Sequence, residues 1–326
     1  MSDKIKYSKG IHQAFTYLLE NHEEFFVIGQ GLWSPWYVGE TMKDLDKKFG
    51  KSRVIDTPVS ELAVTGATIG ASITGFKPLV VHPRVDFMLL AIDQIVTQAA
   101  KWRHMFGNNS SAPATFRAII NRGGEQGAQH SQSLHSWFAH IPGLKVVMPY
   151  DGNDARDLLI SSVLADDPVV FMDDRWLYDE TFEDKGLKLI DLKNVKPKVV
   201  KEGTDITIVG IGFTVKKILD TEISIANLGV SSEIIDLRLL NPIDYSVIIT
   251  SVKKTKRLMV VDGDWSSCGL ASEIITSVME NIPPNELISS PRRLTLANAP
   301  APTSKILEDE YYITSKKIID IIKEIY

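Results

Sequence analysis

A chain of 326 residues that is 44% hydrophobic is long enough to form two domains with separate cores. Its 36 basic and 41 acidic residues leave a formal charge of −5 and form no long run of one sign, which argues against a nucleic-acid partner or an anionic membrane surface. The single cysteine, Cys268, excludes an internal disulfide, and no apolar run reaches the roughly 20 residues that a membrane span requires. We therefore expect a soluble, cytoplasmic protein.

The first half of the chain alternates short β-branched and aromatic runs with longer amphipathic segments. Buried parallel strands with helices on both faces of the sheet produce this pattern, so we expect a doubly wound α/β domain over residues 1–175. The expected strands are 25–29, 78–82, 115–120, 144–149 and 168–173, and the expected helices are 7–20, 60–75, 88–106 and 151–165.

A polar stretch over residues 176–200 lacks sustained periodicity and predicts a linker between domains. A second alternation follows over residues 201–326, where strands are expected at 206–212, 231–240, 257–263 and 292–299. The chain is therefore expected to contain two doubly wound α/β domains, of which the second is smaller.

The turn that contains Gly210 and Gly212 invites a dinucleotide-binding interpretation, because Asp236 ends the next expected strand. The third glycine of that motif is missing, since Val215 stands in its place and would crowd the helix against the strand. An isolated glycine pair is weak evidence for nucleotide binding, so we favour a structural turn.

The segment DTPVSE (56 to 61) ends an apolar strand and opens a helix with a carboxylate, Glu61, in its first turn. A carboxylate at the edge of a tight, poorly hydrated space can share a proton with a bound heterocycle. The alternative is that Ser60 caps the helix and Glu61 complements its positive end. Small residues dominate the helix and would let a backbone or a flat ligand approach closely; they are Ala63, Gly66, Ala67, Gly70, Ala71 and Ser72.

Five motifs occur in one order along the chain: DTPVSE with its small-residue helix, AIDQIVTQAAK (91 to 101), GAQHSQ (127 to 132), HIPGLKVVMP (140 to 149) and KILED (305 to 309). Together they resemble the beta subunits of the thiamine diphosphate-dependent, decarboxylating components of 2-oxo acid dehydrogenase complexes. Pyruvate, branched-chain 2-oxo acid and acetoin dehydrogenases are members of this family. The resemblance covers nearly the whole chain and implies a transketolase-like fold, in which an N-terminal domain binds the pyrimidine and a compact C-terminal domain mainly supports subunit contacts.

The resemblance assigns roles to three side chains. Glu61 matches the carboxylate that hydrogen-bonds the pyrimidine N1′ of thiamine diphosphate and so promotes loss of the C2 proton. Phe87 matches the aromatic residue on which the pyrimidine stacks, and an ordinary core phenylalanine is the alternative. His130 matches the residue that faces the thiazolium and assists acyl transfer to a lipoyl group. A structural histidine is the alternative there, and this alternative suits His135 and His140 better.

The resemblance also implies a monovalent cation such as potassium, held by backbone carbonyls at Ala114, Ser162, Ala165 and Asp167. Magnesium and the diphosphate of the cofactor require an acidic residue and a suitably spaced asparagine after a glycine-rich turn, and this chain has no such segment. In the family an alpha subunit holds both, so we expect the chain to work within an α2β2 heterotetramer and to be inactive alone. A lipoyl acyltransferase core is a further partner that the resemblance implies.

The chain departs from the family at two places near the expected active site. Gln30 stands where members usually carry a glutamate near the pyrimidine, so an amide replaces a charge. His82 and Arg84 stand where the family more often has acidic, amide or aromatic residues, and they could bind an additional anionic group of the substrate. The alternative is that Arg84 pairs with Asp86 or with an acidic residue of a partner chain.

The favoured function is therefore oxidative decarboxylation of pyruvate or a related 2-oxo acid, with acyl transfer to lipoyl. Because of the two departures, a two-subunit thiamine-dependent acyl or ketol transferase that acts on another acceptor, such as a sugar derivative, is a second hypothesis. A noncatalytic scaffold subunit that retains the fold is a third. The substrate cannot be chosen from the sequence.

Overall fold

The computed structural model describes residues 3–326, which divide into two compact units. The first unit extends to Arg122 and resumes with Phe138–Val195, and the second comprises Gly123–Trp137 and Lys196–Tyr326. The segment Gly123–Trp137 thus belongs to the second unit, although residues of the first unit flank it in sequence. Within residues 3–326, no helix is both long and apolar enough to cross a membrane.

A parallel sheet forms the centre of the first unit, with strands in the spatial order β6, β7, β5, β4, β2 and β3. The runs that were predicted as strands form it, because β-branched and aromatic residues suit strands that are buried on both faces. The bounds are β2 (Phe25–Gln30), β3 (Val54–Thr57), β4 (Lys77–His82), β5 (Thr115–Ile120), β6 (Lys145–Val147) and β7 (Val169–Asp174). Because parallel strands end at one edge, Gln30, Thr57 and His82 all lie at the carboxyl edge of this sheet.

Arg117 of β5 is a charged residue at the centre of this sheet and is fully buried. Its guanidinium donates to both carboxylate oxygens of Asp173 (2.9 and 2.7 Å), to Thr41 Oγ1 (2.9 Å) and to the Tyr178 hydroxyl (3.0 Å). Burial disfavours its charge, but Asp173 and Tyr178 hold the pKa of Arg117 above its usual range. The charge is therefore matched by partners from three segments of the first unit.

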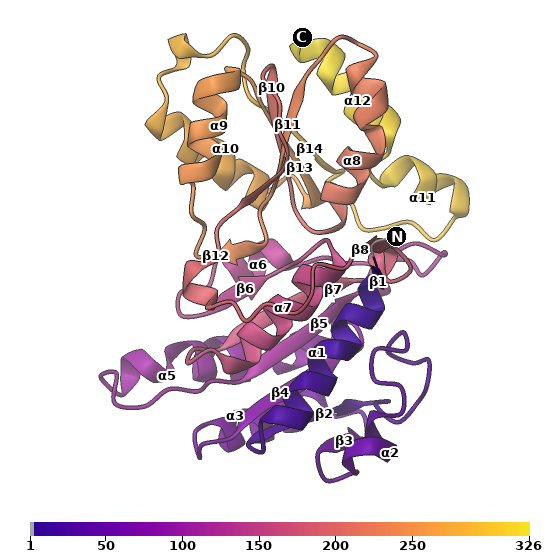
Figure 1. Ribbon diagram of the computed structural model, residues 1–326, viewed down its shortest axis with the longest axis vertical. Helices are drawn as coiled ribbons and strands as arrows, with labels where there is room; N and C mark the ends of the chain where they lie inside the picture. The colour runs from indigo at the N-terminus through magenta and orange to yellow at the C-terminus, as the bar shows by residue number, and fades with distance from the viewer. Residues whose placement is uncertain (1–2) are drawn as a thin grey trace. The chain divides into compact units, whose positions relative to one another are not determined.

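The helices of the first unit are α1 (Tyr7–Asn21), α2 (Leu45–Phe49), α3 (Glu61–Ser72), α4 (Val85–Met88), α5 (Ala100–Met105) and α7 (Gly152–Leu164). Helices α1 and α7 lie side by side against the sheet (Figure 1). Two glycines permit this close packing, because a Cβ atom added at Gly10 would lie 2.2 Å from the carbonyl oxygen of Gly152. A larger residue at Gly10 would force the two helices apart.

The region that was predicted as one helix over 88–106 is helical but changes its winding. A short 3-10 turn, η1 (Leu89–Ala91), and a π-helix, η2 (Asp93–Ala99), separate α4 from α5. A π-helix has more residues per turn than an α-helix, so side chains spaced for an α-helix shift around its axis. Ile95 and Ala99 still lie in the core.

The stretch that was predicted as a linker folds along the first unit before it enters the second. Strand β8 (Thr181–Glu183) pairs antiparallel with β1 (Lys4–Lys6), and 3-10 turns form at η4 (Arg175–Leu177) and η5 (Leu192–Asn194). Arg156 of α7 donates to Asp184 (3.1 Å), which attaches this stretch to the buried helix.

The second unit has its own sheet, in the spatial order β14, β13, β10, β11 and β9, in which only β9 runs antiparallel to its neighbour. Helices α8 and α12 cover one face of this sheet, and α9 and α10 cover the other (Figure 1). The strands are β9 (Lys198–Lys201), β10 (Ile206–Gly210), β11 (Ser232–Asp236), β12 (Leu239–Asn241), β13 (Leu258–Trp265) and β14 (Arg292–Leu296). The helices are α6 (His135–Ala139), which begins in this unit, α8 (Phe213–Ala226), α9 (Ser246–Thr255), α10 (Leu270–Asn281), α11 (Lys305–Tyr311) and α12 (Ser315–Ile325), with short turns η3 (Ala128–His130) and η6 (Pro284–Glu286). The prediction of two α/β domains is confirmed.

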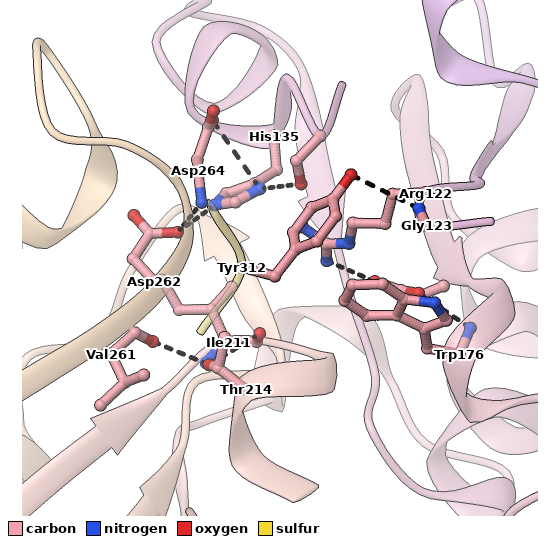
Figure 2. Close-up of polar contacts among 12 residues, drawn as sticks. Arg122, Gly123, His135, Trp176, Ile211, Thr214, Val261, Asp262, Asp264 and Tyr312 are labelled. Carbon is pink, nitrogen blue, oxygen red and sulfur yellow. Dashed lines mark hydrogen bonds and ion pairs between the residues drawn. The ribbon is translucent and has the colours of Figure 1, made fainter. Parts of the chain in front are cut away.

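The glycine turn after β10 is a structural turn, as predicted. The backbone amide of Ile211 donates to Thr214 Oγ1 (2.8 Å), and that hydroxyl donates to the carbonyl of Val261 (2.7 Å; Figure 2). A Cβ atom at Gly210 would lie 2.9 Å from Val215 Cα, which explains the glycine. The amide that a nucleotide phosphate would require is thus engaged by a hydroxyl of the protein itself.

Candidate active site

Glu61 is the first residue of α3 and follows directly on the turn after β3. Its carboxylate is partly exposed and has no hydrogen-bond or ion-pair partner among residues 3–326. Ser60 precedes the helix but makes no side-chain capping bond, so the capping role considered for Ser60 is wrong. The Glu61 carboxylate is therefore available to a ligand.

Glu61 lines a small pocket of about 20 Å³ at the carboxyl edge of the first sheet. The wall of the pocket consists of the ends of β2 and β4, the turn after β3 and the start of α3. Gln30 and His82 contribute its polar side chains, and Val64, Val80 and Val81 contribute apolar surface. Three of the residues that the sequence singled out, Glu61, Gln30 and His82, are thus brought together in one place. Apolar surface and polar side chains thus adjoin the Glu61 carboxylate at this edge of the sheet.

His82 is almost fully buried at the end of β4, and its Nε2 atom lies 3.2 Å from Thr65 Oγ1 of α3. Burial lowers the pKa of His82 to about 4. The imidazole is therefore neutral at pH 7, and it can offer a hydrogen bond to a ligand but no positive charge. The prediction that His82 helps to bind an anionic group of the substrate therefore stands only for a hydrogen bond from the neutral ring, and it stays a prediction.

A row of polar contacts leads from the pocket to Arg175, whose charge acts on Arg84. Gln30 Nε2 donates to the Tyr37 hydroxyl (2.9 Å), and Arg175 donates to the Tyr37 carbonyl. Burial lowers the pKa of Arg84, attraction by Asp86 raises it, and repulsion by Arg175 lowers it further. Asp86 thus attracts the charge of Arg84, while Arg84 and Arg175 place two positive charges near Tyr37. The pairing of Arg84 with Asp86 stays a prediction.

Phe87 lies on α4 and is 39% exposed, so it is not the core phenylalanine that was considered as the alternative. Its ring is accessible, but it does not line the pocket that contains Glu61. The stacking role of Phe87 stays a prediction.

His130 ends the turn η3 in the segment Gly123–Trp137 and is half-buried. It belongs to the second unit, whereas Glu61 belongs to the first. His135, in the same segment, is fully buried, with both ring nitrogens within hydrogen-bond distance of protein groups. The structural role that the sequence favoured for His135 agrees with this environment.

Comparisons with known proteins account for both units. The transketolase pyrimidine-binding domain matches residues 3–180, and the transketolase C-terminal domain matches residues 195–318. The mitochondrial pyruvate dehydrogenase E1 subunit beta of Saccharomyces cerevisiae is 36% identical over 97% of this chain and 87% of its own length. The beta subunit of an acetoin:2,6-dichlorophenolindophenol oxidoreductase from Bacillus subtilis is 33% identical over 100% of this chain and 98% of its own.

The chain belongs to the family of thiamine diphosphate-dependent 2-oxo acid dehydrogenase beta subunits. The resemblance inferred from the ordered motifs is therefore confirmed. A solved structure described as a split gene transketolase, inactive beta4 tetramer, matches with a TM-score of 0.77 over 98% of each chain. At 18% sequence identity, that likeness supports the fold alone.

Three of the four carbonyl groups that were predicted to hold a monovalent cation accept hydrogen bonds from the protein. The carbonyl of Ala114 accepts from Val169 N (3.1 Å), that of Ser162 from Thr115 Oγ1 (3.1 Å), and that of Ala165 from Lys77 Nζ (2.8 Å). The side-chain carboxylate of Asp167 forms ion pairs with Arg103 and Lys145. Because the Lys77 ammonium would repel a second cation beside Ala165, these residues fit potassium poorly, and we derive no role for it.

The sequence did not indicate Tyr37 or Arg175 as site residues. Tyr37 lies in a loop after β2 with two exposed tryptophans, Trp33 and Trp36, and Arg175 directly follows β7. A run of exposed aromatics after a buried strand was the available signal, because ligands of α/β sheets bind at the carboxyl ends of the strands.

Proposed function

We propose that this chain is the subunit of a thiamine diphosphate-dependent 2-oxo acid dehydrogenase that activates the pyrimidine half of the cofactor. The observation that carries the proposal is the Glu61 carboxylate, which has no partner among residues 3–326 and lies in a pocket at the carboxyl edge of the sheet. A carboxylate that no protein group engages is free to accept a hydrogen bond from a ligand at this edge of the sheet.

When bound, thiamine diphosphate supplies a nucleophilic carbon, C2 of its thiazolium, for attack on the 2-oxo group. Glu61 would hold the aminopyrimidine ring by sharing a proton with its N1′ atom, which would favour the imino form of the ring, and that form would supply the base for the C2 proton. Gln30 and the neutral His82 orient the ring by hydrogen bonds from the pocket wall. Phe87 is proposed to stack on the ring, and His130 to act on the substrate side of C2.

The exposed face beside Glu61 supports a requirement for an alpha subunit. Val59 and Leu62 flank Glu61 and are 65% and 56% exposed, and the small residues Ala63, Ala67 and Gly70 continue this face along α3. An apolar surface next to a charged site is typical of a face that another chain covers. We propose that an alpha subunit covers it in an α2β2 heterotetramer and holds the diphosphate and magnesium.

The same proposal includes the substrate, the acyl acceptor and the cellular location. The substrate is pyruvate or a related 2-oxo acid, and the acyl group passes to the lipoyl group of an acyltransferase core. We propose a cytoplasmic location, because a free thiol such as exposed Cys268 is stable in a reducing compartment.

A second function is favoured by one set of observations, the two arginines and the exposed aromatic loop. Arg84 and Arg175 carry charge near Tyr37, and Trp36 is 73% exposed in the same loop. Guanidinium groups bind phosphate or carboxylate, and aromatic rings pack on sugar rings. This set suits a two-subunit acyl or ketol transferase whose acceptor is an anionic sugar derivative.

The test is co-expression of this chain with a candidate alpha subunit from the same genome, followed by calorimetry with thiamine diphosphate and magnesium. We expect tight cofactor binding by the pair and none by this chain alone. The pair is then supplied with single 2-oxo acids, and the formation of acyl-dihydrolipoamide from lipoamide and of sugar-acceptor products is followed separately. Tight binding by this chain alone would contradict the shared site, and a pair that binds cofactor but turns over no 2-oxo acid would point to the scaffold.

A further inference from the structure

The segment Gly123–Trp137 has little regular structure of its own. Apart from η3 and the start of α6, it is an irregular loop, and Gly123, Glu125, Gly127 and Leu134 have positive φ angles. Such a loop has few backbone hydrogen bonds to fix its path, so its position depends on side-chain contacts. His130 lies in its middle, between two sets of such contacts.

The first set of contacts is a buried cluster around His135 (Figure 2). His135 Nε2 lies 2.8 Å from Asp262 Oδ1, and Nδ1 lies 2.8 Å from Ser133 Oγ. Because a carboxylate only accepts, Nε2 carries a proton and donates to Asp262. Asp264 adds a second carboxylate, 3.9 Å from Nδ1. The ring is thus held from both sides.

Asp262 is held firmly in turn, because it lies on β13 beside the start of α10. Its Oδ2 accepts from the amide of Ala271 (3.2 Å), and its Oδ1 accepts from the amide of Asp264 (3.1 Å). Next to it, Ser136 Oγ accepts from the amide of Leu270 (3.1 Å). The loop is therefore attached to a central strand and to a helix start of the second unit.

The second set of contacts lies before His130. The amide of Glu125 donates to Glu308 Oε2 (2.9 Å), and the amide of Gly123 donates to the Tyr312 hydroxyl (3.4 Å; Figure 2). Glu308 is buried, on α11. Gly127 packs so closely on Thr303 that a Cβ atom there would lie 2.8 Å from Thr303 Oγ1.

Ser133, His135 and Asp262 also have the order of contacts found in nucleophilic triads. Ser133 and His135 are 3% and 0% exposed, so no substrate could reach that hydroxyl. The cluster therefore has a positioning role rather than a nucleophilic one.

We propose that the buried His135–Asp262 pair is a positioning device that fixes the loop bearing His130, so that the second unit presents a reactive side chain. The part of the proposal that concerns catalysis rests on the proposed function of His130, and the part that concerns the loop does not. Under this proposal the second domain contributes to the reaction as well as to subunit contacts.

The test uses Asp262→Asn in the enzyme assembled with its alpha subunit. The amide weakens the bond to His135, so we expect backbone amides of residues 124–134 to exchange at least about tenfold faster, as local opening becomes easier. We expect kcat to fall about tenfold while the Kd for thiamine diphosphate changes less than about twofold, as loss of orientation alone would cause. Thr221→Val is the matched control, because it removes one buried hydrogen bond within α8 of the second unit, to the carbonyl of Lys217, and leaves β13 and the loop untouched.

A double variant separates positioning from general damage. If Asp262 acts through His130, then Asp262→Asn should add less than about a twofold loss of kcat when His130 is already alanine. A loss in the double variant equal to the product of the single losses would overturn the proposal, as would unchanged exchange in residues 124–134. If His130→Ala is fully active but exchange still rises with Asp262→Asn, the loop attachment stands and the proposed role of His130 fails. If Asp262→Asn does not fold, the same measurements are made on Ser133→Ala, which removes only one contact of His135.

Discussion

Glu61 and Arg117 are both charged residues of the first unit, but their surroundings are opposite. Arg117 is fully buried and donates to Asp173, Thr41 and Tyr178. Glu61 lies in a pocket at the edge of the same sheet and has no partner among residues 3–326. A buried charge with complete partners serves the fold, whereas a carboxylate left without a partner in a pocket is suited to a ligand.

The comparison predicts opposite consequences for substitution at the two positions. Removing the Glu61 charge should affect the reaction and leave the fold intact. Removing the Arg117 charge should affect the fold first. If both substitutions acted on stability, or both on activity alone, the distinction between the two kinds of charge would be wrong.

The largest effect is expected for Glu61→Gln in the assembled enzyme. An amide cannot share a proton with pyrimidine N1′, so kcat should fall by about a thousandfold or more. The free energy of unfolding should change by less than about 1 kcal/mol, because no protein contact is lost. Glu23→Gln, an exposed carboxylate of the same unit, is the control and should leave turnover unchanged. Steady-state kinetics and urea unfolding of the same preparations give both quantities.

Arg117→Met is the reciprocal change. It leaves the buried Asp173 carboxylate without its cationic partner, with the Tyr178 hydroxyl as a remaining donor, so the free energy of unfolding should fall by about 3 to 5 kcal/mol. Lys47→Met, which breaks an exposed ion pair with Asp44, should cost less than about 1 kcal/mol. Equal losses for the two variants in urea titrations would show that the buried network contributes no more than a surface pair.

The sequence predicted the sheets and the main helices because their signals are local. Periodicity marked β4, β5 and α7, and the motif around Glu61 marked the pocket. The π-helix η2 was not foreseen, because one extra residue per turn leaves no clear pattern. The assignment of Gly123–Trp137 to the second unit was also hidden, since its contacts are with residues far away in sequence, such as that of His135 with Asp262, 127 residues away. The hydrogen bond between Gln30 and Tyr37 could not be predicted either, because it depends on the conformation of the loop that carries Tyr37.

His82 lines the same pocket as Glu61, but unlike Glu61 it is buried, and burial keeps its side chain neutral. Its pKa is about 4 in the folded chain, against an ordinary value of 6.5. The unfolded chain therefore binds the proton more readily, and stability that is present above pH 6.5 is lost as the pH falls toward 4. The loss attributable to this residue should approach about 3 kcal/mol. Urea titrations at several pH values should show a shallower decline for His82→Gln than for the unchanged chain.

His130→Ala tests whether the reactive groups extend beyond the first unit. In the assembled enzyme we expect kcat to fall about a hundredfold, with the Kd for thiamine diphosphate nearly unchanged, as for loss of an acid or base on the substrate side. The rate of acyl transfer to the natural acceptor should fall more than the rate of turnover with an artificial electron acceptor. Equal losses in cofactor affinity and turnover would return His130 to a structural role.

Arg84→Gln should produce the smallest effect, and a selective one. For substrates or acceptors that carry a phosphate or a second carboxylate, kcat/KM should fall about tenfold, the value of one charge-assisted contact. Arg84→Lys keeps the charge and should recover part of that loss. For pyruvate, kcat/KM should hardly change. An equal loss for pyruvate would place Arg84 among residues that pair with Asp86 to maintain the fold.

The most direct test of the account is the rate of hydrogen–deuterium exchange at C2 of thiamine diphosphate in the assembled enzyme, measured by rapid quench and nuclear magnetic resonance. Exchange reports removal of the C2 proton alone, before any 2-oxo acid binds. We predict fast exchange in the unchanged enzyme and a rate about a thousandfold slower with Glu61→Gln. An unchanged rate would contradict the account and would leave Glu61 with no role beyond the positive end of α3.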